Sequence, residues 1–415
     1  MAGDGIRGLA EARMTLHADD LAGLRHQIYS CKQCTSCREW YWNDPHLPGF
    51  EPGVTKEGFV ICPIFRHTTG AESDYARGKV KLAQGLLDEQ IAPSEYVVEK
   101  LFQCAQCANC SEHCPQTRVE KLDPAEVIRA ARAEVVRQGV TLPRAIEVPT
   151  RRPARPRSLP TRWISKGAHG QTGAPLAFFP GCVFGHSFKH QAVAKSFIAL
   201  LNCLDASHQV LTEGWCCGYP AFAAGKTDDA TDLARRAVER LRALGVCTLV
   251  VGCAWGLRMF RREYPELLGR ALDVKVLHAV EFLADEVAAG RLQLSNPWEV
   301  TVTYQDPCQL GRRCGVYDAP RELARAIPGV TLVEMVENRE NALCCGGGVS
   351  AAYPDLAQDI GATRVAQAVE ASAQVILTAC PAGQSNLRLA AARSGSRVVV
   401  MDLVEAIAAA AGVDG

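Results

Sequence analysis

Cysteine spacing constrains this chain more than any other feature of its sequence. The chain has 415 residues, and 19 of them are cysteines. Residues 1–20 carry charges where a signal peptide would need an apolar stretch, so export by the general route is not expected. An odd number of thiols in a long chain of this kind suits metal ligation better than a disulfide framework.

Four cysteines near residue 110 follow the spacing C-x2-C-x2-C-x3-C, and a proline comes next. This spacing is typical of bacterial ferredoxins, in which the thiolates surround a cubane [4Fe–4S] cluster. Zinc is the main alternative, but zinc sites favour two separated C-x2-C pairs. The run therefore predicts a cubane, and its members are Cys104, Cys107, Cys110 and Cys114.

An earlier run begins in the same way at Cys31 but has no fourth cysteine at the expected place. The next cysteine after this run, Cys62, precedes a proline as Cys114 does. In two-cluster ferredoxins the fourth cysteine of each run binds the other cluster. We therefore predict a crossed arrangement. One cubane is expected on Cys31, Cys34, Cys37 and Cys114, and a second on Cys104, Cys107, Cys110 and Cys62.

The remainder of the chain is an internal repeat of about 127 residues, which is the size of a small domain. A single cysteine, an adjacent pair followed by glycine, and another single cysteine occur in the same order twice. The first copy has Cys182, Cys216, Cys217 and Cys253, and the second has Cys308, Cys344, Cys345 and Cys380. Matching offsets on an uncommon residue indicate duplicated metal sites rather than scattered core thiols.

Adjacent cysteines can bind one metal centre only if the backbone between them has a particular conformation. Neighbouring side chains of an extended chain point in opposite directions, so a pair can share one metal centre only where the chain turns sharply. Gly218 and the three glycines at 346–348 permit such turns. Each repeat therefore offers four thiolates from three separate segments.

Short apolar runs precede the single cysteines, and helical patterns separate them. This alternation predicts α/β units with parallel strands, in which sites lie where strands end. The expected strands are 176–179, 248–251, 300–304 and 375–377. The expected helices are 186–202, 227–244, 318–327, 355–372 and 383–393. The predicted fold class is α/β, with a helical two-cluster ferredoxin-like domain before two repeated α/β domains.

These patterns divide the chain into four parts. They are a ferredoxin-like domain over 1–140, a linker over 141–174, and repeated domains over 175–295 and 296–415. The linker is rich in proline and arginine, which keep a segment solvated and non-helical. A solvated surface segment is the simpler interpretation, and a docking patch for an acidic partner is the alternative.

Three cysteines and one histidine stand outside these patterns. Cys203 and Cys247 are interpreted as core residues. Cys314 lies six residues after Cys308, so a role as a displaced ligand or a redox-active thiol is the alternative to packing. His278 is interpreted as a hydrogen-bonded histidine near the boundary between the repeats, with a role as ligand or proton donor as the alternative.

The repeated half resembles the paired cysteine-rich CCG domains found in the D subunits of heterodisulfide reductases. The matching segments are FFPGC (178–182), WCCG (215–218), DPCQLGR (306–312), GVYDAPRE (315–322), NRENALCCGGG (338–348) and TACP (378–381). The whole plan is also similar to iron–sulfur subunits of glycolate, lactate and anaerobic glycerol-3-phosphate oxidoreductases. It is similar, too, to electron-transfer subunits of tungsten-type benzoyl-CoA reductase. The resemblance implies iron–sulfur clusters and redox function.

The chain departs from that family at the end of each motif. Family motifs end in C-x-x-C, which gives five cysteines per repeat and a noncubane [4Fe–4S] cluster that reduces a disulfide. Here Gly256 and Gly383 hold the fifth position, and glycine has no side-chain ligand. Gln309 replaces a histidine that is frequent in the family. Four thiolates still suit a cubane or a [2Fe–2S] cluster, so the departures favour electron relay over disulfide reduction.

Charge and motif content argue against several other functions. Lys plus Arg and Asp plus Glu each number 45, which disfavours bulk nucleic-acid binding. The sequence has no run of about 20 apolar residues, so a membrane span is not expected. It has no P-loop, no Ser-His-Asp arrangement and no GxGxxG between a strand and a helix, so this chain is not expected to bind NAD or flavin.

We therefore expect a cytoplasmic iron–sulfur oxidoreductase subunit of anaerobic metabolism, with peripheral attachment to a membrane complex left open. It would relay electrons between a flavoprotein, or another electron-transfer subunit, and an acceptor within a hetero-oligomeric complex. The expected cofactors are two [4Fe–4S] clusters in the N-terminal domain and one or two further iron–sulfur clusters in the repeats, with zinc left open for one. The alternatives are a catalytic subunit that reduces a disulfide and a zinc-binding scaffold. No catalytic residue is assigned.

Overall fold

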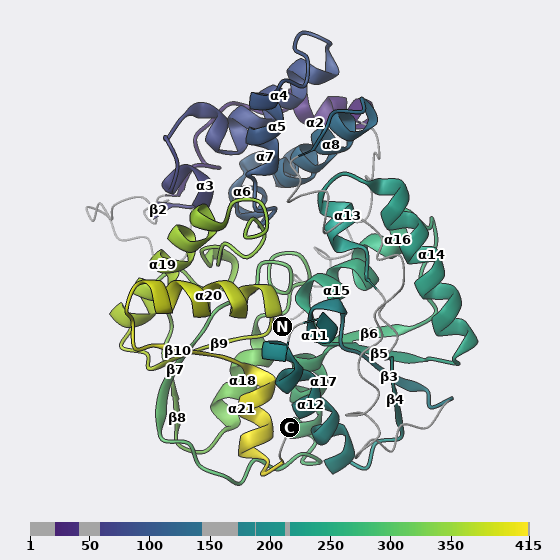
Figure 1. Cartoon of the computed structure of the whole chain (residues 1–415), viewed down its shortest axis with the longest axis vertical. Coiled ribbons are helices and arrows are strands. Elements are labelled where there is room, and N and C mark those ends of the chain that lie inside the picture. The colour runs from purple at the N-terminus through teal and green to yellow at the C-terminus, as the bar shows by residue number, and fades with distance from the viewer. Residues whose placement is uncertain (1–20, 41–58, 143–172, 187, 212–215, 414–415) are drawn as a thin grey trace, which may run out of the picture.

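The computed structural model describes residues 21–40, 59–142, 173–186, 188–211 and 216–413. A helical module, residues 21–142, covers one end of a larger body that consists of two α/β repeats (Figure 1). The predicted fold class is confirmed by this arrangement. Most of the predicted linker, residues 143–172, lies outside the described residues.

In the helical module, prolines and one capping carboxylate determine where several helices begin. Pro63, Pro115 and Pro124 stand in the first turn of their helices, where a backbone N–H has no intrahelical partner. Asp123 caps the last helix and accepts from two backbone N–H groups at 3.1 and 3.2 Å. The elements are η1 (Leu21–Leu24), α2 (Arg25–Tyr29), β1 (Glu39–Trp40), β2 (Phe59–Val60), α3 (Pro63–Arg66), η2 (Glu72–Asp74), α4 (Ala76–Leu87), α5 (Glu95–Phe102), α6 (Asn109–His113), α7 (Pro115–Val119) and α8 (Pro124–Arg137).

The first repeat has a parallel sheet in the order β4-β3-β5-β6 across the described residues. Its central strands β3 and β5 are buried, which agrees with their apolar sequences. The elements are β3 (Leu176–Phe179), α11 (Cys182–His186), α12 (Phe188–Cys203), β4 (His208–Val210), α13 (Tyr219–Ala223), α14 (Thr227–Ala243), β5 (Thr248–Val251), α15 (Ala254–Arg258), η3 (Met259–Glu263), α16 (Tyr264–Leu267), β6 (Lys275–His278) and α17 (Ala279–Ala288).

The second repeat has the same sheet order, β8-β7-β9-β10, and is again parallel where it is described. The four predicted strands are confirmed as β3, β5, β7 and β9. The helix expected from residue 383 begins instead at Pro381, because proline suits the first helical position. The elements are β7 (Val300–Tyr304), α18 (Asp318–Ala326), β8 (Val330–Leu332), η4 (Arg339–Asn341), α19 (Pro354–Glu370), β9 (Val375–Thr378), α20 (Pro381–Arg393), β10 (Val399–Asp402) and α21 (Leu403–Ala410).

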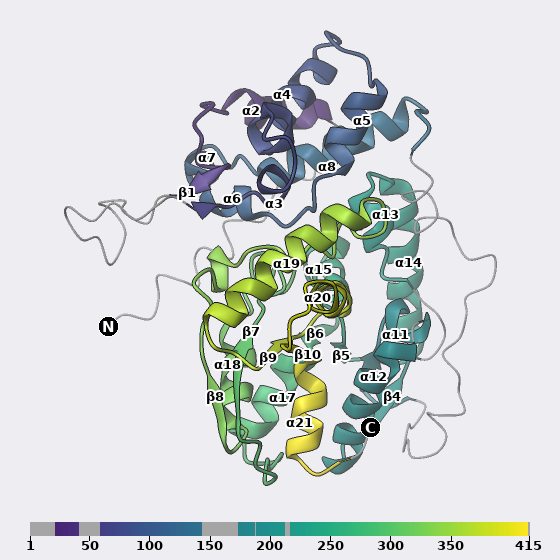
Figure 2. The same ribbon diagram turned by 60° about the vertical axis from the view of Figure 1, so that its left-hand side comes forward.

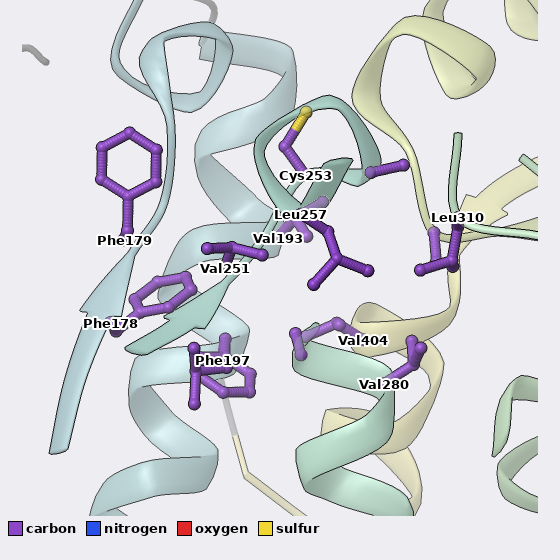
Figure 3. Packing of buried hydrophobic residues seen from close by; sticks show 14 of the residues in the cluster. Phe178, Phe179, Val193, Phe197, Val251, Cys253, Leu257, Val280, Leu310 and Val404 are labelled. Carbon is purple, nitrogen blue, oxygen red and sulfur yellow. The ribbon is translucent and has the colours of Figure 1, made fainter. Parts of the chain in front are cut away.

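The two repeats share one hydrophobic core. Helix α12 of the first repeat packs on α21 of the second, and α17 packs on α18 (Figure 2). Phe178 and Phe197 of the first repeat belong to the same buried cluster as Leu310 and Val404 of the second (Figure 3). Because burial of apolar side chains is the main stabilising term in folding, the repeats are expected to fold together rather than as independent units.

Equivalent positions of the repeats hold a buried histidine and a buried aspartate. His278 ends β6 and caps α17 through Nδ1, which accepts from Val280 N at 3.3 Å. Asp402 ends β10 and caps α21 through Oδ1, which accepts from Val404 N at 3.0 Å. Burial lowers the pKa of His278 to about 3 and raises the pKa of Asp402 to about 8. Among the described residues, His278 Nε2 and Asp402 Oδ2 have no hydrogen-bond partner.

Asp402→Asn should raise stability above pH 6 and have little effect at pH 4. Between pH 4 and 8 the folded chain holds a proton on Asp402 that the unfolded chain has lost, so its stability falls as pH rises. The slope from this group is at most about 1.4 kcal/mol per pH unit. Asparagine keeps the helix cap but does not titrate. Thermal unfolding followed by circular dichroism at several pH values measures the difference; parallel pH profiles for the two proteins would contradict it.

Buried ion pairs connect the helical module with both repeats. Glu126 of α8 accepts from Arg258 of α15 at 2.7 Å and lies 3.2 Å from Arg313 of the second repeat. Arg258 also donates to Glu263 at 2.6 Å, and Arg313 donates to Asp123 at 2.6 Å. Both guanidinium groups are buried. Since a buried charge is costly without its partner, these pairs hold three segments in a fixed relation.

Arg258→Met is expected to destabilise the protein by about 3 kcal/mol, because Glu126 and Glu263 lose a buried partner. Arg242→Met is the matched control, since Arg242 pairs with Asp273 at an exposed site. The control should cost less than about 1 kcal/mol. Denaturant unfolding of both variants, followed by circular dichroism, measures the two effects. Equal losses of stability in the two variants would show that the buried ion pairs stabilise the protein no more than a surface ion pair does.

Candidate metal centres

Four thiols of the helical module surround one cavity, here called cavity A. Lys32, Arg77, Gln116 and apolar side chains complete its wall. Cys34 is exposed to solvent, whereas Cys37 is buried. The thiols that line it are Cys31, Cys34, Cys37 and Cys114.

A second cavity, here called cavity B, lies next to the first, and Ala76 lines both. The Lys79 ammonium group forms part of its wall and donates to Asp74 O at 2.6 Å. The thiols that line cavity B are Cys62, Cys104, Cys107 and Cys110. The structure thus brings the eight cysteines together in the two sets that the crossed arrangement expects.

Left-handed residues direct the thiols toward these cavities. Gln33 and Gln106 occupy the same place in the two cysteine runs and have φ of 55° and 52°, and Ala108 has φ of 60°. This conformation is unfavourable for residues other than glycine. The left-handed residues bend the backbone around the cavity, so that three cysteines of one short loop can line it.

The chemistry of the donor set fits a cationic cluster. Burial raises the pKa of Cys37 to about 12 and the pKa of Cys62 to about 11. Such thiols stay protonated at neutral pH unless a nearby positive charge stabilises the thiolate. A bound iron–sulfur cluster would supply that charge, and thiolates are the ligands that such clusters take.

Each repeat arranges three of its four cysteines as a contiguous group. Cys216 makes hydrogen-bond contacts with Cys182 and Cys217, and Gly218 N donates to Cys216 Sγ at 3.4 Å. Gly218 has φ of 83°, so the expected sharp turn is present at this pair.

The second repeat follows the same plan. Cys344 makes hydrogen-bond contacts with Cys308 and Cys345, and Gly346 N donates to Cys344 Sγ at 3.4 Å. Gly346 has φ of 81°. Hydrogen bonding from Cys344 lowers the pKa of Cys345 to about 7.

The fourth cysteine of each repeat lies at the boundary between the repeats. Cys253 precedes α15 and Cys380 precedes α20. The two thiols belong to one buried cluster, and each shifts the pKa of the other. Both are buried. A Cβ atom at Gly383 would lie 3.4 Å from Cys345 Sγ, so this glycine faces the site without offering a ligand.

Two residues beside the second repeat's cysteines make contacts that the sequence did not predict. Arg312 donates from Nε to Cys107 O at 2.8 Å. Gln309 donates to Gln106 O at 2.9 Å and lies 3.5 Å from Cys308 Sγ. Both belong to the segment DPCQLGR, so the motif itself was the signal that pointed to them.

Two of the three remaining cysteines differ from expectation, and the third, Cys314, packs as its simpler interpretation expects. Cys203 and Cys247 are exposed, so their interpretation as core residues is wrong. Cys203 ends α12 and Cys247 stands just before β5, and element ends face solvent more often than element centres. Cys314 packs against the core, and burial raises its pKa to about 11.

Two kinds of feature are absent from the part of the chain that the structure describes. No three His, Cys, Asp or Glu side chains there are grouped as a single metal ion would require. No helix in the described ranges is both long and apolar enough to cross a membrane.

The cysteine-rich CCG domain family matches the chain twice, over residues 176–261 and 302–388. The D subunit of dihydromethanophenazine:CoB–CoM heterodisulfide reductase from Methanosarcina barkeri is 32% identical, over 93% of this chain and 95% of that protein. The B subunit of fumarate reductase (CoM/CoB) from Methanothermobacter marburgensis is 28% identical, over 83% of this chain and 68% of that protein. EtfAB:quinone oxidoreductase from Syntrophomonas wolfei is 27% identical over 85% of this chain, which spans about half (53%) of that protein.

A solved structure has a similar fold. A hypothetical protein from Helicobacter pylori superposes with a TM-score of 0.50 at 10% identity, over 82% of this chain and 73% of that one. At this identity the likeness concerns the fold alone. The sequence relatives carry the assignment, since they match along most of the chain and are oxidoreductase subunits. The chain belongs to the family of heterodisulfide reductase D subunits and is an iron–sulfur oxidoreductase subunit.

Proposed function

We propose that this chain relays single electrons between a flavoprotein partner and an acceptor. The relay uses two [4Fe–4S] clusters in cavities A and B and iron–sulfur centres in the two repeats. The observation that supports it most directly is the placement of cavities A and B, each lined by four thiols and separated by Ala76. Two redox centres this close suit electron transfer better than two independent structural sites.

The ligand sets of cavities A and B follow from the same placement, and those of the repeats follow from the cysteine groups described above. Cavity A would use Cys31, Cys34, Cys37 and Cys114, and cavity B would use Cys62, Cys104, Cys107 and Cys110. The repeats would use Cys182, Cys216, Cys217 and Cys253, and Cys308, Cys344, Cys345 and Cys380. When bound, such clusters supply one-electron oxidation and reduction.

The protein's own groups hold and tune these centres. Each site has at least one buried thiol, and Cys34 leaves one edge of cavity A open to solvent. Gly218 N and Gly346 N donate hydrogen bonds to cysteine sulfur. Hydrogen bonds to sulfur and burial both shift cluster potentials.

A flavoprotein is the natural partner, because a one-electron relay needs a group that splits two-electron donors. This chain shows no dinucleotide-binding motif of its own. Relatives are named as subunits of larger oxidoreductases, which supports work within a hetero-oligomeric complex.

Disulfide reduction is the second candidate. The contact of Cys253 with Cys380 places the two repeats' thiols against each other, and a relative at 32% identity is named as part of a heterodisulfide reductase. Gly256 and Gly383 weigh against it, because neither repeat has a fifth thiol.

Pairs of cysteine substitutions test the crossed ligation. Cys114→Ala and Cys37→Ala should each remove about four irons, and the double variant should lose no more, because both line cavity A. Cys114→Ala with Cys107→Ala should lose about eight. Iron analysis of anaerobically purified protein measures this, with exposed Cys203→Ala as the control that loses none. A loss of only about four from the last pair would favour the uncrossed arrangement.

Metal analysis with electron paramagnetic resonance (EPR) tests the function. About 16 irons and cubane-type signals in the reduced protein are expected for a relay with four centres. About 8 irons together with zinc would instead identify the repeats as a scaffold. A further signal in the oxidised protein that changes when thiols are added would favour disulfide reduction.

A further inference from the structure

The helical module contacts the cysteines of the two repeats unequally, although the repeats share one sheet order. Cys107 of cavity B and Cys344 of the second repeat belong to one buried cluster, and each thiol shifts the pKa of the other. The backbones also approach closely there, since a Cβ atom at Gly348 would lie 2.6 Å from Ala105 O. The second repeat's thiols therefore adjoin cavity B directly.

Contacts with the first repeat are of a different kind. Arg132 of α8 donates to Ala223 O at 2.6 Å, and the Arg129 guanidinium lies 4.4 Å from the centre of the Phe222 ring. Tyr219, at the start of the same helix α13, stacks on Trp255 at 4.6 Å. The ion pair of Arg258 with Glu126 and a close backbone approach at Gly225, whose Cβ atom would lie 2.4 Å from Ala133 N, complete this interface. These contacts involve none of the first repeat's cysteines.

Two side chains of the second repeat build the direct contact. Gln309 binds Gln106 O and Arg312 binds Cys107 O, so consecutive carbonyls of the cavity B loop are held by one segment. Arg312 also donates to Ala342 O at 2.7 Å, just before the Cys344–Cys345 pair. The first repeat has Val183 at the position of Gln309, and valine cannot donate a hydrogen bond.

The two repeats meet through a second thiol contact. Cys380 of the second repeat lies against Cys253 of the first, and both thiols are buried. The thiols of the described chain therefore form a succession from cavity A to cavity B, the second repeat and the first repeat.

We infer that the repeats are not equivalent and that the second repeat is the obligatory intermediate between the helical module and the first repeat. This inference rests on the proposed electron relay and holds for either direction of flow. One electron moves in each step, and no covalent bond forms or breaks. Arg312 and Gln309 are positioning residues, since they hold the cavity B loop against Cys344 without belonging to a ligand set.

EPR of the reduced holoprotein tests the order through magnetic coupling between neighbouring centres. Cys345→Ala removes the second-repeat centre, and Cys217→Ala removes the first-repeat centre. Loss of the coupling that broadens the cavity B signal is expected in Cys345→Ala only. Cys217→Ala should instead change the signal of the second-repeat centre.

The outcomes separate this order from the proposed function. Iron content that shows no clusters in the repeats would overturn the relay itself. Clusters in both repeats with an equal effect of the two substitutions on the cavity B signal, or with no effect of either, would overturn only the order.

Arg312→Lys tests the positioning role. It should keep the iron content and lose part of the coupling between cavity B and the second-repeat centre. Arg129→Lys is the matched control, because Arg129 is as deeply buried in the helical module but faces Phe222 of the first repeat. Gln309→Val, which copies the first repeat, provides a second variant with the same expected loss. Unchanged magnetic coupling in both Arg312→Lys and Gln309→Val would overturn the positioning role of these two residues.

Discussion

Buried charge at the junction of the helical module with the two repeats is the interaction on which the rest of the structure depends. Arg258 and Arg313 come from different repeats, yet both reach Glu126 of α8. The two arginines and Glu126 cannot move far apart, because an unpaired buried charge is far less stable than a paired one. The junction therefore sets the distance between cavity B and the thiols of the second repeat.

Duplication explains the similarity of the repeats, and the helical module explains their difference. The same turn at Gly218 and Gly346 presents an adjacent cysteine pair in each copy. A single helical module can adjoin only one copy in the same way. The shared core then brings Cys253 and Cys380 together at the boundary between the repeats.

Much of the fold could be predicted from local sequence patterns. The four central strands were predicted because they are apolar and buried. The edge strands β4, β6, β8 and β10 were missed because their burial is mixed and their sequences are less uniformly apolar. Cys203 and Cys247 were misplaced because cysteine is usually buried, and helix and strand ends override that preference. The burial of His278 and of Asp402 could not be predicted from hydrophobic periodicity, because each is a single capping residue at the end of a strand.

The sequence by itself determined the number and spacing of the cysteines, because the spacing within each cysteine run is a local property of the chain. It also determined the absence of a fifth thiol at Gly256 and Gly383. Only the tertiary structure decided which repeat adjoins cavity B. That contact joins residues more than 200 positions apart, through Gln309 with Gln106 and Arg312 with Cys107. The two repeats carry the same cysteine spacing, so spacing alone does not show which of them lies against cavity B. Packing and buried hydrogen bonds between distant residues decide that, and local sequence spacing does not encode them.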